Sequence, residues 1–302
     1  MTLTATSLLP SFDDAELVVP APGAGPGNWA GAASAVLVDS VFWLVWRNRR
    51  PLADGRGVTV TVARSTDGVE FETVAEVGRD QFGCESLERP VLVPLPAEGS
   101  APRRWRLYLS CATWGSKHWW VDSLTAADPA ELAGGERAVI LPGDERTAVK
   151  DPVITLTRER GWEMWLCAHP LTEPGHEDRM TTRYLTSGDG LAWVDHGVVL
   201  GGRPGTWDAR GARVTTVLCH EPLTVLYDGR PDAASNWYET TGVARWDGAR
   251  LVPDSGMAPI RSPYADGAFR YVSAVPLPDG RTRFYVEAAR PDGAHDLVTM
   301  VR

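Results

Sequence analysis

The sequence predicts an all-β protein, a five-bladed β-propeller whose blades are four-stranded antiparallel sheets around a central funnel. Three observations support this prediction: aromatic-rich strands recur about every sixty residues, an apolar strand precedes each of them, and helical patterns are almost absent. The aromatic-rich strands begin at residues 42, 105, 163, 223 and 282. A pair of β-sandwiches would also contain many short strands, but it would show no regular period.

Each predicted blade begins with an apolar strand, continues through a short polar turn into the aromatic-rich strand, and ends with further β-like segments. The first strands read AASAVLV, RPVLVPL, DPVITL, ARVTTVL and YVSAVPL. Two turns, STDGVEF at 65 and SGDGLAW at 187, share a Ser-x-Asp-Gly pattern that is typical of hairpins, because Asp-Gly readily adopts positive φ angles. Only DPAELAGGE at 128 has a pattern that favours a helical turn.

These elements predict a single domain over residues 1–302. The blades are expected near residues 28–80, 86–142, 148–200, 208–260 and 268–302. The strand-like run DAELVVP, within residues 10–22, has no place in the first blade. We expect it to complete the last blade and so to close the ring without leaving an open sheet edge.

Composition excludes several classes of function. A net charge of −9 disfavours nucleic acid or an anionic membrane surface as the main partner. No stretch approaches the roughly 18 apolar residues that span a bilayer, and the first twenty residues lack the pattern of a secretion signal. We therefore expect a cytoplasmic monomer. The four Cys and six His residues show no metal-ligand spacing, so we expect no metal and no cofactor.

Charged residues stand directly before two of the apolar first strands. Glu88 and Arg89 precede Pro90, and Lys150 and Asp151 precede Pro152. Charges entering a hydrophobic strand are costly unless they find partners or line a wet cavity. Since first strands line the channel of a propeller, we expect these side chains to point into the mouth of the funnel. The alternative is an ion-pair latch between blades, such as Glu88 with Lys150.

Matching positions in the other blades, and the turns on the same face, supply further candidates. Asp208 lies just before the fourth first strand and is the third candidate carboxylate. Tryptophan faces stack on sugar rings, and Arg, Asp and Asn side chains satisfy hydroxyl groups. The candidate substrate-binding residues are Asn28, Trp29, Arg47, Arg89, Trp114, His118, His169, Trp207, Arg213 and Tyr271.

At these residues the chain resembles the five-bladed propellers of glycoside hydrolase family 43 and its relatives, families 32, 62 and 130. KDP at 150 matches the Asp-Pro form that starts their inner strands, and ERP at 88 matches the Glu-x-Pro form. The stretch GNWAGAASAVLVDSVFWLVWRNRR with RSTDGVEFE is similar to a first blade of family 130. The resemblance implies a propeller whose inner-strand carboxylates perform acid–base work at the bottom of the funnel.

Two departures from family 43 bear on the mechanism. The segment NWAGAA has no carboxylate where that family carries its general base, and RGARVTT has no Glu for a general acid. Asp208 is the nearest acid to the second segment. The chain is therefore either a divergent hydrolase with another carboxylate arrangement or a propeller recruited for other chemistry.

The first functional hypothesis is a glycoside-processing enzyme, a hydrolase or phosphorylase acting on a sugar or a glycosylated small molecule. Such chemistry needs two carboxyl groups roughly 5 to 9.5 Å apart. Glu88 is expected to donate the proton and Asp151 to orient or activate. Arg47, Arg49, Arg89 and Lys150 would hold a phosphate, a sugar carboxylate or the paired acids. The alternatives are a lyase, cyclase or transferase for a small metabolite, and a non-catalytic carbohydrate-binding propeller.

Overall fold

The computed structural model describes residues 9–97, 102–265 and 267–302, and it confirms the all-β prediction. Three separate four-stranded antiparallel sheets follow one another along the chain. The first contains β6 (Leu87–Pro94), β7 (Trp105–Ala112), β8 (Trp119–Ala126) and β9 (Glu136–Leu141). The second contains β10 (Thr147–Thr157), β11 (Gly161–Pro170), β12 (Thr181–Ser187) and β13 (Trp193–Leu200). The third contains β14 (Gly211–His220), β15 (Leu223–Arg230), β16 (Thr240–Trp246) and β17 (Leu251–Pro253).

An eight-stranded sheet joins the two ends of the described chain. One half contains β2 (Trp29–Val38), β3 (Val41–Arg49), β4 (Gly57–Ser65) and β5 (Glu72–Gly78). The other half contains β18 (Phe269–Pro276), β19 (Thr282–Ala289) and β20 (His295–Val301), with β1 (Glu16–Val19) paired antiparallel to β20. A single parallel pair, Trp29 with His295, connects the halves. Without that pair, each half is a run of four antiparallel strands like the other sheets.

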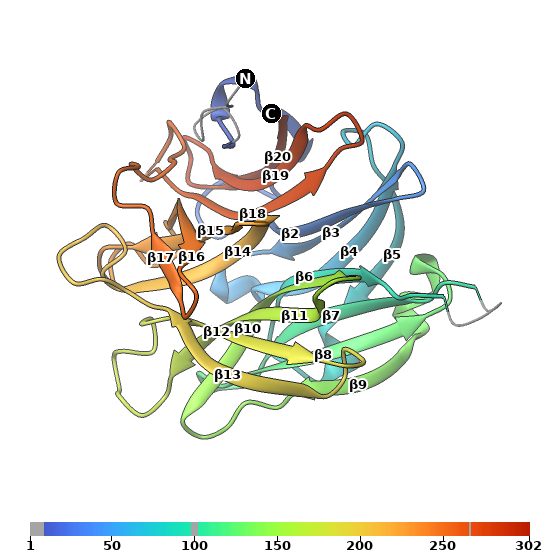
Figure 1. Ribbon diagram of the computed structural model, residues 1–302, viewed down its shortest axis with the longest axis horizontal. Helices are drawn as coiled ribbons and strands as arrows, with labels where there is room; N and C mark the ends of the chain where they lie inside the picture. The colour runs from blue at the N-terminus through green and yellow to red at the C-terminus, as the bar shows by residue number, and fades with distance from the viewer. Residues whose placement is uncertain (1–8, 98–101, 266) are drawn as a thin grey trace.

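The first strands of the five runs pack against one another. β2 contacts β6, β6 contacts β10, β10 contacts β14, β14 contacts β18, and β18 contacts β2. Figure 1 shows the fourth strands β5, β9 and β13 toward the outside of the molecule. The number of blades stays a prediction, but this order of contacts places the ends of all five first strands near one another.

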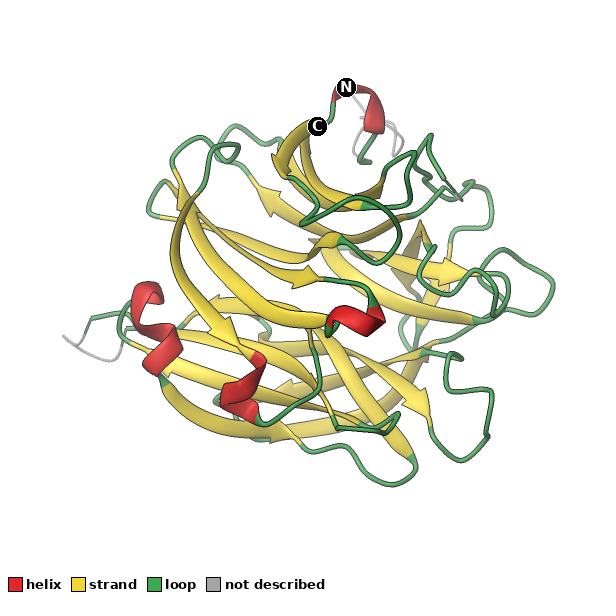
Figure 2. Cartoon of the chain, turned by 180° about the vertical axis from the view of Figure 1, so that it is seen from behind, coloured by secondary structure: helices red, strands yellow, loops and turns green. Residues whose placement is uncertain are grey.

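Short 3-10 helices are the only helices in the described ranges, and Figure 2 shows them between strands and near the N-terminus. They are η2 (Phe12–Asp14), η3 (Leu52–Asp54), η4 (Arg79–Phe82) and η5 (Pro129–Gly134). η5 forms where the sequence showed its one helical pattern. No helix in these ranges is long and apolar enough to cross a membrane. The first eight residues, on which the expectation of no secretion signal partly rests, lie outside the described residues.

The two Ser-x-Asp-Gly turns each contact a strand outside their own run of four strands. Gly68 and Gly190 both have positive φ, at 78° and 72°, as the turn pattern predicts. The phenol of Tyr285 in β19 donates a hydrogen bond to the Gly68 carbonyl at 2.9 Å, and that of Tyr108 in β7 donates to the Gly190 carbonyl at 2.8 Å. Each turn therefore satisfies a buried tyrosine of another four-stranded run, and apolar side chains pack around each tyrosine.

Every first strand changes its pairing register near the same point. The shifts fall between Gly31 and Ser34, Glu88 and Val91, Lys150 and Val153, Val214 and Thr216, and Arg270 and Ser273. At three of these irregularities a non-glycine residue has positive φ: Ala32 at 52°, Asp151 at 52° and Tyr271 at 53°. Such conformations are sparsely populated for these residues. Bulges re-aim side chains and often lie beside functional sites.

Candidate functional site

A small cavity of about 40 Å³ lies where the first strands begin, on the N-terminal side of the register shifts. We call it the cationic cavity. Seven of its lining side chains carry positive charge and two are carboxylates. Its lining residues are Trp29, Arg47, Arg49, Arg56, Glu88, Lys150, His169, Met180, Arg213, Arg230, Asn236, Trp237, Glu239, Arg270 and Tyr271. The sequence-predicted residues Glu88, Trp29, Arg47, His169, Arg213 and Tyr271 are thus brought together.

Glu88 reaches the cavity from β6 and is buried. Its carboxylate forms an ion pair with Arg47 of β3, and the guanidinium of Arg56 lies 3.9 Å away. Burial opposes ionisation of Glu88, but Arg47 and Lys150 outweigh it and hold the pKa below its usual value. Glu88 is therefore ionised in the ligand-free protein. The example partner Lys150 lies 3.7 Å from Asp151 instead, so the ion pair that Glu88 forms between sheets is with Arg47.

Asp151 lies directly behind the cavity wall and is fully buried. Its carboxylate accepts a hydrogen bond from Arg213 at 2.8 Å and one from the Tyr271 phenol at 3.1 Å. Burial opposes its ionisation, but Lys150 and Arg213 hold its pKa well below the usual range. Its backbone N–H donates to the Ser110 hydroxyl at 2.8 Å, which anchors the strained residue to β7. Asp151 thus fixes two side chains that face the cavity.

Glu287 in β19 places its carboxylate against the segment NWAGAA, which has no acid of its own. It is buried and contacts Arg47 at 3.0 Å, Arg270 at 3.2 Å and the His295 ring at 2.8 Å. It also accepts the Ala32 backbone N–H at 3.0 Å. A Cβ atom on Gly31 would collide with this carboxylate, so glycine makes room for it. Sequence reasoning missed Glu287, and its only signal was a lone acid in the apolar run FYVEAA.

Two further buried carboxylates complete the charge network. Asp228 of β15 contacts Arg213 at 2.8 Å and accepts the Tyr271 backbone N–H at 3.0 Å. Its pKa is raised because burial outweighs the attraction of Arg213. Glu239, beside β16, bridges Arg230 at 2.7 Å and Arg270 at 2.6 Å. Burial opposes ionisation of Glu239, but these arginines lower its pKa to about 2. Both acids were missed, since each stands alone in its strand or turn.

Tyr271 stands at the centre of the cationic wall. The guanidinium of Arg213 lies 3.9 Å from its ring centre and that of Arg270 lies 4.7 Å away. Its phenol accepts a hydrogen bond from Arg213 at 2.8 Å while donating to Asp151. Burial raises the pKa of Tyr271 well above its usual value despite the nearby arginines. The phenol is therefore neutral and acts as a bridge between Arg213 and Asp151.

His169 contributes a neutral imidazole to the cavity. Its Nδ1 lies 2.7 Å from the Glu177 carbonyl, which can only accept, so Nδ1 carries the proton. Nε2 is then free to accept from the Cys167 thiol at 3.3 Å. Burial, reinforced by Lys150, lowers the pKa of His169 to about 3. Burial likewise raises the pKa of Cys167 to about 12, so the pair is uncharged near neutral pH.

Replacing His169 by glutamine is expected to flatten the acid dependence of stability. The folded protein keeps the imidazole unprotonated down to about pH 3, whereas the unfolded chain protonates it below about 6.5. Stability therefore falls as the pH drops from about 6.5 toward 3, by up to about 1.4 kcal/mol per pH unit from this group. Urea unfolding between pH 7.5 and 4.5 measures the slope. The control is His176→Gln, on the surface. If stability depends on pH as steeply in His169→Gln as in the wild-type protein, His169 is not the buried neutral imidazole described above.

Arg89 takes a different place from the one predicted for it. Its Nη2 points to the backbone carbonyls of Ala33 at 3.4 Å, Thr215 at 2.5 Å and Val272 at 3.4 Å, in three different first strands. Within the described ranges no carboxylate lies within 4.0 Å of its guanidinium, so Arg47 is the residue that pairs with Glu88. Arg89 thus holds first strands together across the channel, beside the cationic cavity.

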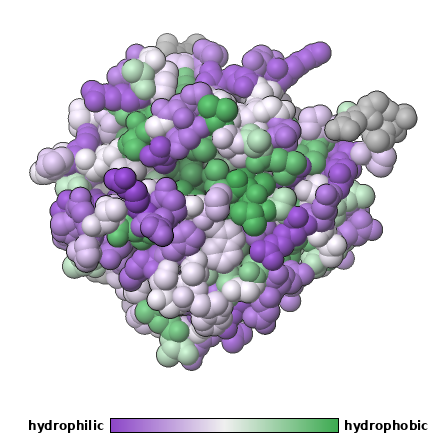
Figure 3. Space-filling model, turned by 90° about the horizontal axis from the view of Figure 1, so that it is seen from below, coloured by the Kyte–Doolittle hydropathy of each residue, from purple (hydrophilic) through white to green (hydrophobic). Residues whose placement is uncertain are grey.

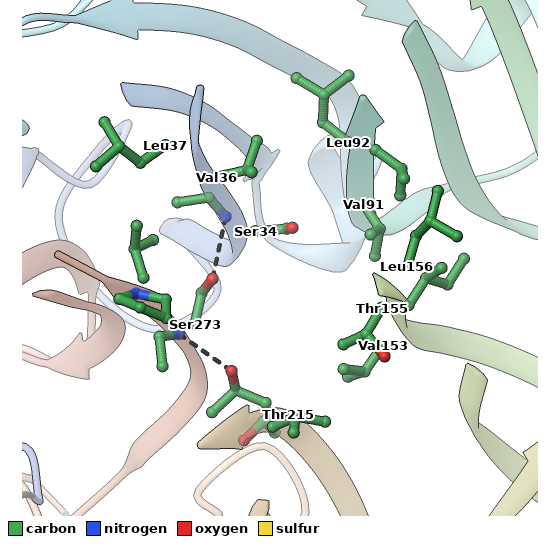
Figure 4. A pocket seen from close by; sticks show the side chains of 18 of the residues that line it. Ser34, Val36, Leu37, Val91, Leu92, Val153, Thr155, Leu156, Thr215 and Ser273 are labelled. Atoms are coloured by element: carbon green, nitrogen blue, oxygen red, sulfur yellow. Dashed lines mark hydrogen bonds between the residues drawn. The ribbon is translucent and has the colours of Figure 1, made fainter. Parts of the chain in front are cut away.

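A second cavity of about 480 Å³ opens on the other side of Arg89. Figure 4 shows it between the C-terminal halves of the first strands, with Val36, Leu37, Val91, Leu92, Val153 and Leu156 on its walls. Its polar groups are hydroxyls such as those of Ser273 and Thr216, which accept backbone N–H groups of neighbouring strands. This end of the channel offers no carboxylate among the described residues that line it. The titratable side chains that line it are those of Arg89 and His220.

Several sequence-predicted residues lie away from the cationic cavity. Asp208 is buried against Arg203 at 2.9 Å and the Tyr227 phenol at 2.8 Å, and Trp207 stacks on the Tyr227 ring. Asn28, Trp114 and His118 are also outside its lining: Asn28 bonds to a nearby backbone carbonyl, Trp114 is exposed, and His118 borders a separate groove. Among the residues that the structure describes, no group of three His, Cys, Asp or Glu side chains could hold a metal.

The surface seen in Figure 3 is mostly hydrophilic, with apolar patches between charged side chains. On the cavity face, Trp29 and Trp237 are 6.0 Å apart between ring centres and flank Arg49. Trp29 is buried between Arg49 and the stacked ring of His295, whereas Trp237 is exposed beside the charged cavity and can contact the apolar face of a polar molecule.

The fold is similar to propeller glycoside hydrolases in solved structures. A thermostable family-43 glycoside hydrolase matches with a TM-score of 0.67 at 14% identity, over 93% of this chain and 91% of that chain. The GH93 α-L-arabinofuranosidase of Fusarium graminearum, in complex with arabinobiose, matches at 0.60 and 13%, over 96% and 97%. The β-1,2-mannobiose phosphorylase of Listeria innocua matches at 0.60 and 14%, over 98% and 93%. No family model and no curated protein matches the sequence.

Proposed function

We propose that this chain is a glycoside-processing enzyme, a hydrolase or phosphorylase, that acts on a sugar or glycosylated small molecule at the cationic cavity. The observation that carries the proposal is the position of Glu88 and Asp151. They come from adjacent first strands, both are buried, and both stand at the bulge beside the same cavity. The fold similarity to glycoside hydrolases and to a phosphorylase supports the same class of chemistry.

We assign the proton transfer to Glu88 and the positioning to Asp151. Of the two acids in the lining, Glu239 is held between Arg230 and Arg270, so Glu88 is the one assigned to the transfer, whereas Asp151 acts through Arg213 and Tyr271. In the ligand-free protein Glu88 is ionised, so it has to take up a proton before it can give one to a leaving oxygen. A bound anion that offsets the charge of Arg47 and Lys150 would raise the pKa of Glu88 and allow this uptake.

The architecture that we propose for this function is one five-bladed propeller domain over residues 1–302. Contacts between successive first strands, and the return from β18 to β2, support five blades. The pairing of β1 with β20 supports completion of the last blade by the N-terminal strand. In this arrangement the cationic cavity lies on the axis, and each blade contributes side chains to it or to the wall behind it.

One observation favours the second candidate, a lyase, cyclase or transferase acting on a small metabolite. Ala32 stands at the bulge of β2, where its positive φ matches that of Asp151 in β10 but its side chain carries no acid. Glu287 fills this region and is fully engaged with Arg47, Arg270 and His295. The site therefore offers no second free carboxylate on β2, which a mechanism with two such groups would need. It does offer what a mechanism with a charged pocket and a single base needs.

The test of the proposed function is a turnover screen of the purified protein on neutral and acidic disaccharides and aryl glycosides, with and without inorganic phosphate. Release of a free sugar is expected from at least one substrate. Formation of a sugar phosphate only when phosphate is present would identify a phosphorylase. Release of an unsaturated or cyclised product would favour the second candidate. Binding of sugars in calorimetry without any product would contradict an enzyme and favour a carbohydrate-binding propeller.

A further inference from the structure

We propose that the cationic cavity binds an oxoanion, either a carboxylate or phosphate carried by the sugar or a free phosphate ion. The proposal deepens the proposed function by naming the charge of its ligand, and it rests on that function only for the sugar. The first support is a local excess of positive charge. Seven cationic side chains line the cavity against two carboxylates, in a chain whose net charge is −9.

The buried acids behind the wall do not neutralise this excess evenly. Asp151 and Asp228 pair with Arg213, and Glu287 pairs with Arg47 and Arg270. These pairs leave Arg49, Arg56 and Lys150 of the lining without a carboxylate at hydrogen-bond distance among the described residues. The positive charge of the lining is therefore only partly compensated by close ion pairs.

Arg49 is buried, yet within the described ranges no carboxylate lies within 4.0 Å of it. It donates only to the backbone carbonyls of Gly27 at 3.1 Å and Arg50 at 3.4 Å. Arg56 has Glu85 at 3.7 Å and Glu88 at 3.9 Å, both beyond a normal hydrogen bond. Lys150 has only Asp151, at 3.7 Å, among the described carboxylates. All three cations are thus available to a negatively charged ligand.

Tryptophan rings hold these three cations in place. The guanidinium of Arg49 lies 4.0 Å from the ring centre of Trp29. Trp119 lies between the other two, 5.3 Å from Arg56 and 4.7 Å from the ammonium of Lys150. An aromatic face orients a cation but does not cancel its charge. The cavity therefore presents positioned positive groups that keep their capacity for charge-assisted hydrogen bonds.

The size of the cavity fits a small charged group. A volume of about 40 Å³ has room for about three water molecules, since each needs roughly 10 to 15 Å³. A carboxylate or phosphate group fits in the space of such a cluster of water molecules, whereas a whole sugar ring is too large for it. The ring would lie further out, toward Trp237. The pKa of Arg49, lowered to about 10 by burial and by Arg47, agrees with an unneutralised positive site.

Calorimetry at low ionic strength tests the proposal with inorganic phosphate, glucuronate and glucose as probes. At least one anion is expected to bind, and glucose is expected to bind at least about tenfold more weakly, because charge-assisted hydrogen bonds are the strong ones. Binding of glucuronate alone indicates a sugar-borne carboxylate, and binding of phosphate alone indicates a phosphate site. Equal or absent binding of all three probes would overturn the proposal.

Two variants locate the binding site. Lys150→Gln and Arg56→Gln are each expected to weaken anion binding about tenfold or more. The matched control is Arg64→Gln, an exposed arginine of β4 that pairs with Glu72 on the surface. Unfolding midpoints confirm that each variant is folded, since Lys150 and Arg56 are partly exposed. Anion affinity unchanged in both would overturn the assignment. Calorimetry measures binding and not turnover. The result on anion binding can therefore be told apart from a failure of the proposal that the protein is an enzyme.

Discussion

Replacing Glu287 by glutamine is expected to lower the free energy of unfolding by about 3 to 5 kcal/mol, as removal of one partner from a buried ion pair typically does. The glutamine has nearly the same volume, so the loss comes from charge and not from packing. Arg47 and Arg270 would keep their burial without the carboxylate that now lies 3.0 and 3.2 Å away. The His295 ring would also lose its charged acceptor.

Chemical denaturation with an unchanged m-value measures this loss. The control is Glu72→Gln, which breaks an exposed pair with Arg64 and should cost at most about 1 kcal/mol. If Glu287→Gln lowers the free energy of unfolding by no more than the control does, Arg47 and Arg270 find other partners. The close approach of Glu287 to Gly31 would then have no energetic importance.

Substituting Glu88 by glutamine or Asp151 by asparagine is expected to reduce turnover of the true substrate about 10²-fold or more, the usual contribution of a general acid or base. The two variants should differ in kind. Glu88→Gln removes the proton-transferring group and should lower kcat across the pH range. Asp151→Asn loosens Arg213 and Tyr271 and should raise KM together with the fall in kcat.

The pH dependence of the wild-type enzyme provides a second readout of Glu88. Arg47, Arg56 and Lys150 favour its ionised form, while burial and Asp151 oppose it. If a bound oxoanion offsets the cations, the acid group in the substrate complex titrates at higher pH than in the free enzyme. As the pH rises, kcat should then begin to fall at a higher pH than kcat/KM does. The Glu88→Gln variant should lack this fall at high pH. Full activity in both variants would contradict the assignment of Glu88 and Asp151.

The sequence predicted those parts of the molecule that depend on local patterns. The Asp-Gly turns at 67 and 189 form because a short segment specifies them, and the period of the strands fixes the succession of sheets. Glu88 and Lys150 were found because a charge before a Pro-headed strand is conspicuous. They lie at one cavity because adjacent first strands begin on the same side.

The remaining parts depend on contacts between distant segments, which no local pattern encodes. Glu287 of β19 reaches the space beside Gly31 from a segment far along the chain, so the lack of an acid in NWAGAA does not mean that the space beside it has none. Asp208 precedes β14 by a loop and turns back onto Arg203, away from the cavity. Arg89 leaves its neighbour Glu88 because the carbonyls of three other strands converge on it.

The pairing of β1 with β20 has a consequence for how the chain is made. Glu16 lies opposite Thr299, so β1 leaves the ribosome long before the strand with which it pairs. The intermediate sheets are each built from consecutive segments and can form while translation continues. The sheet that contains β18 to β20 cannot be completed until synthesis has passed Val301. β1 meanwhile keeps its backbone hydrogen-bonding groups unpaired, and a nascent chain stalled before β20 would expose a free strand to its neighbours on the same message.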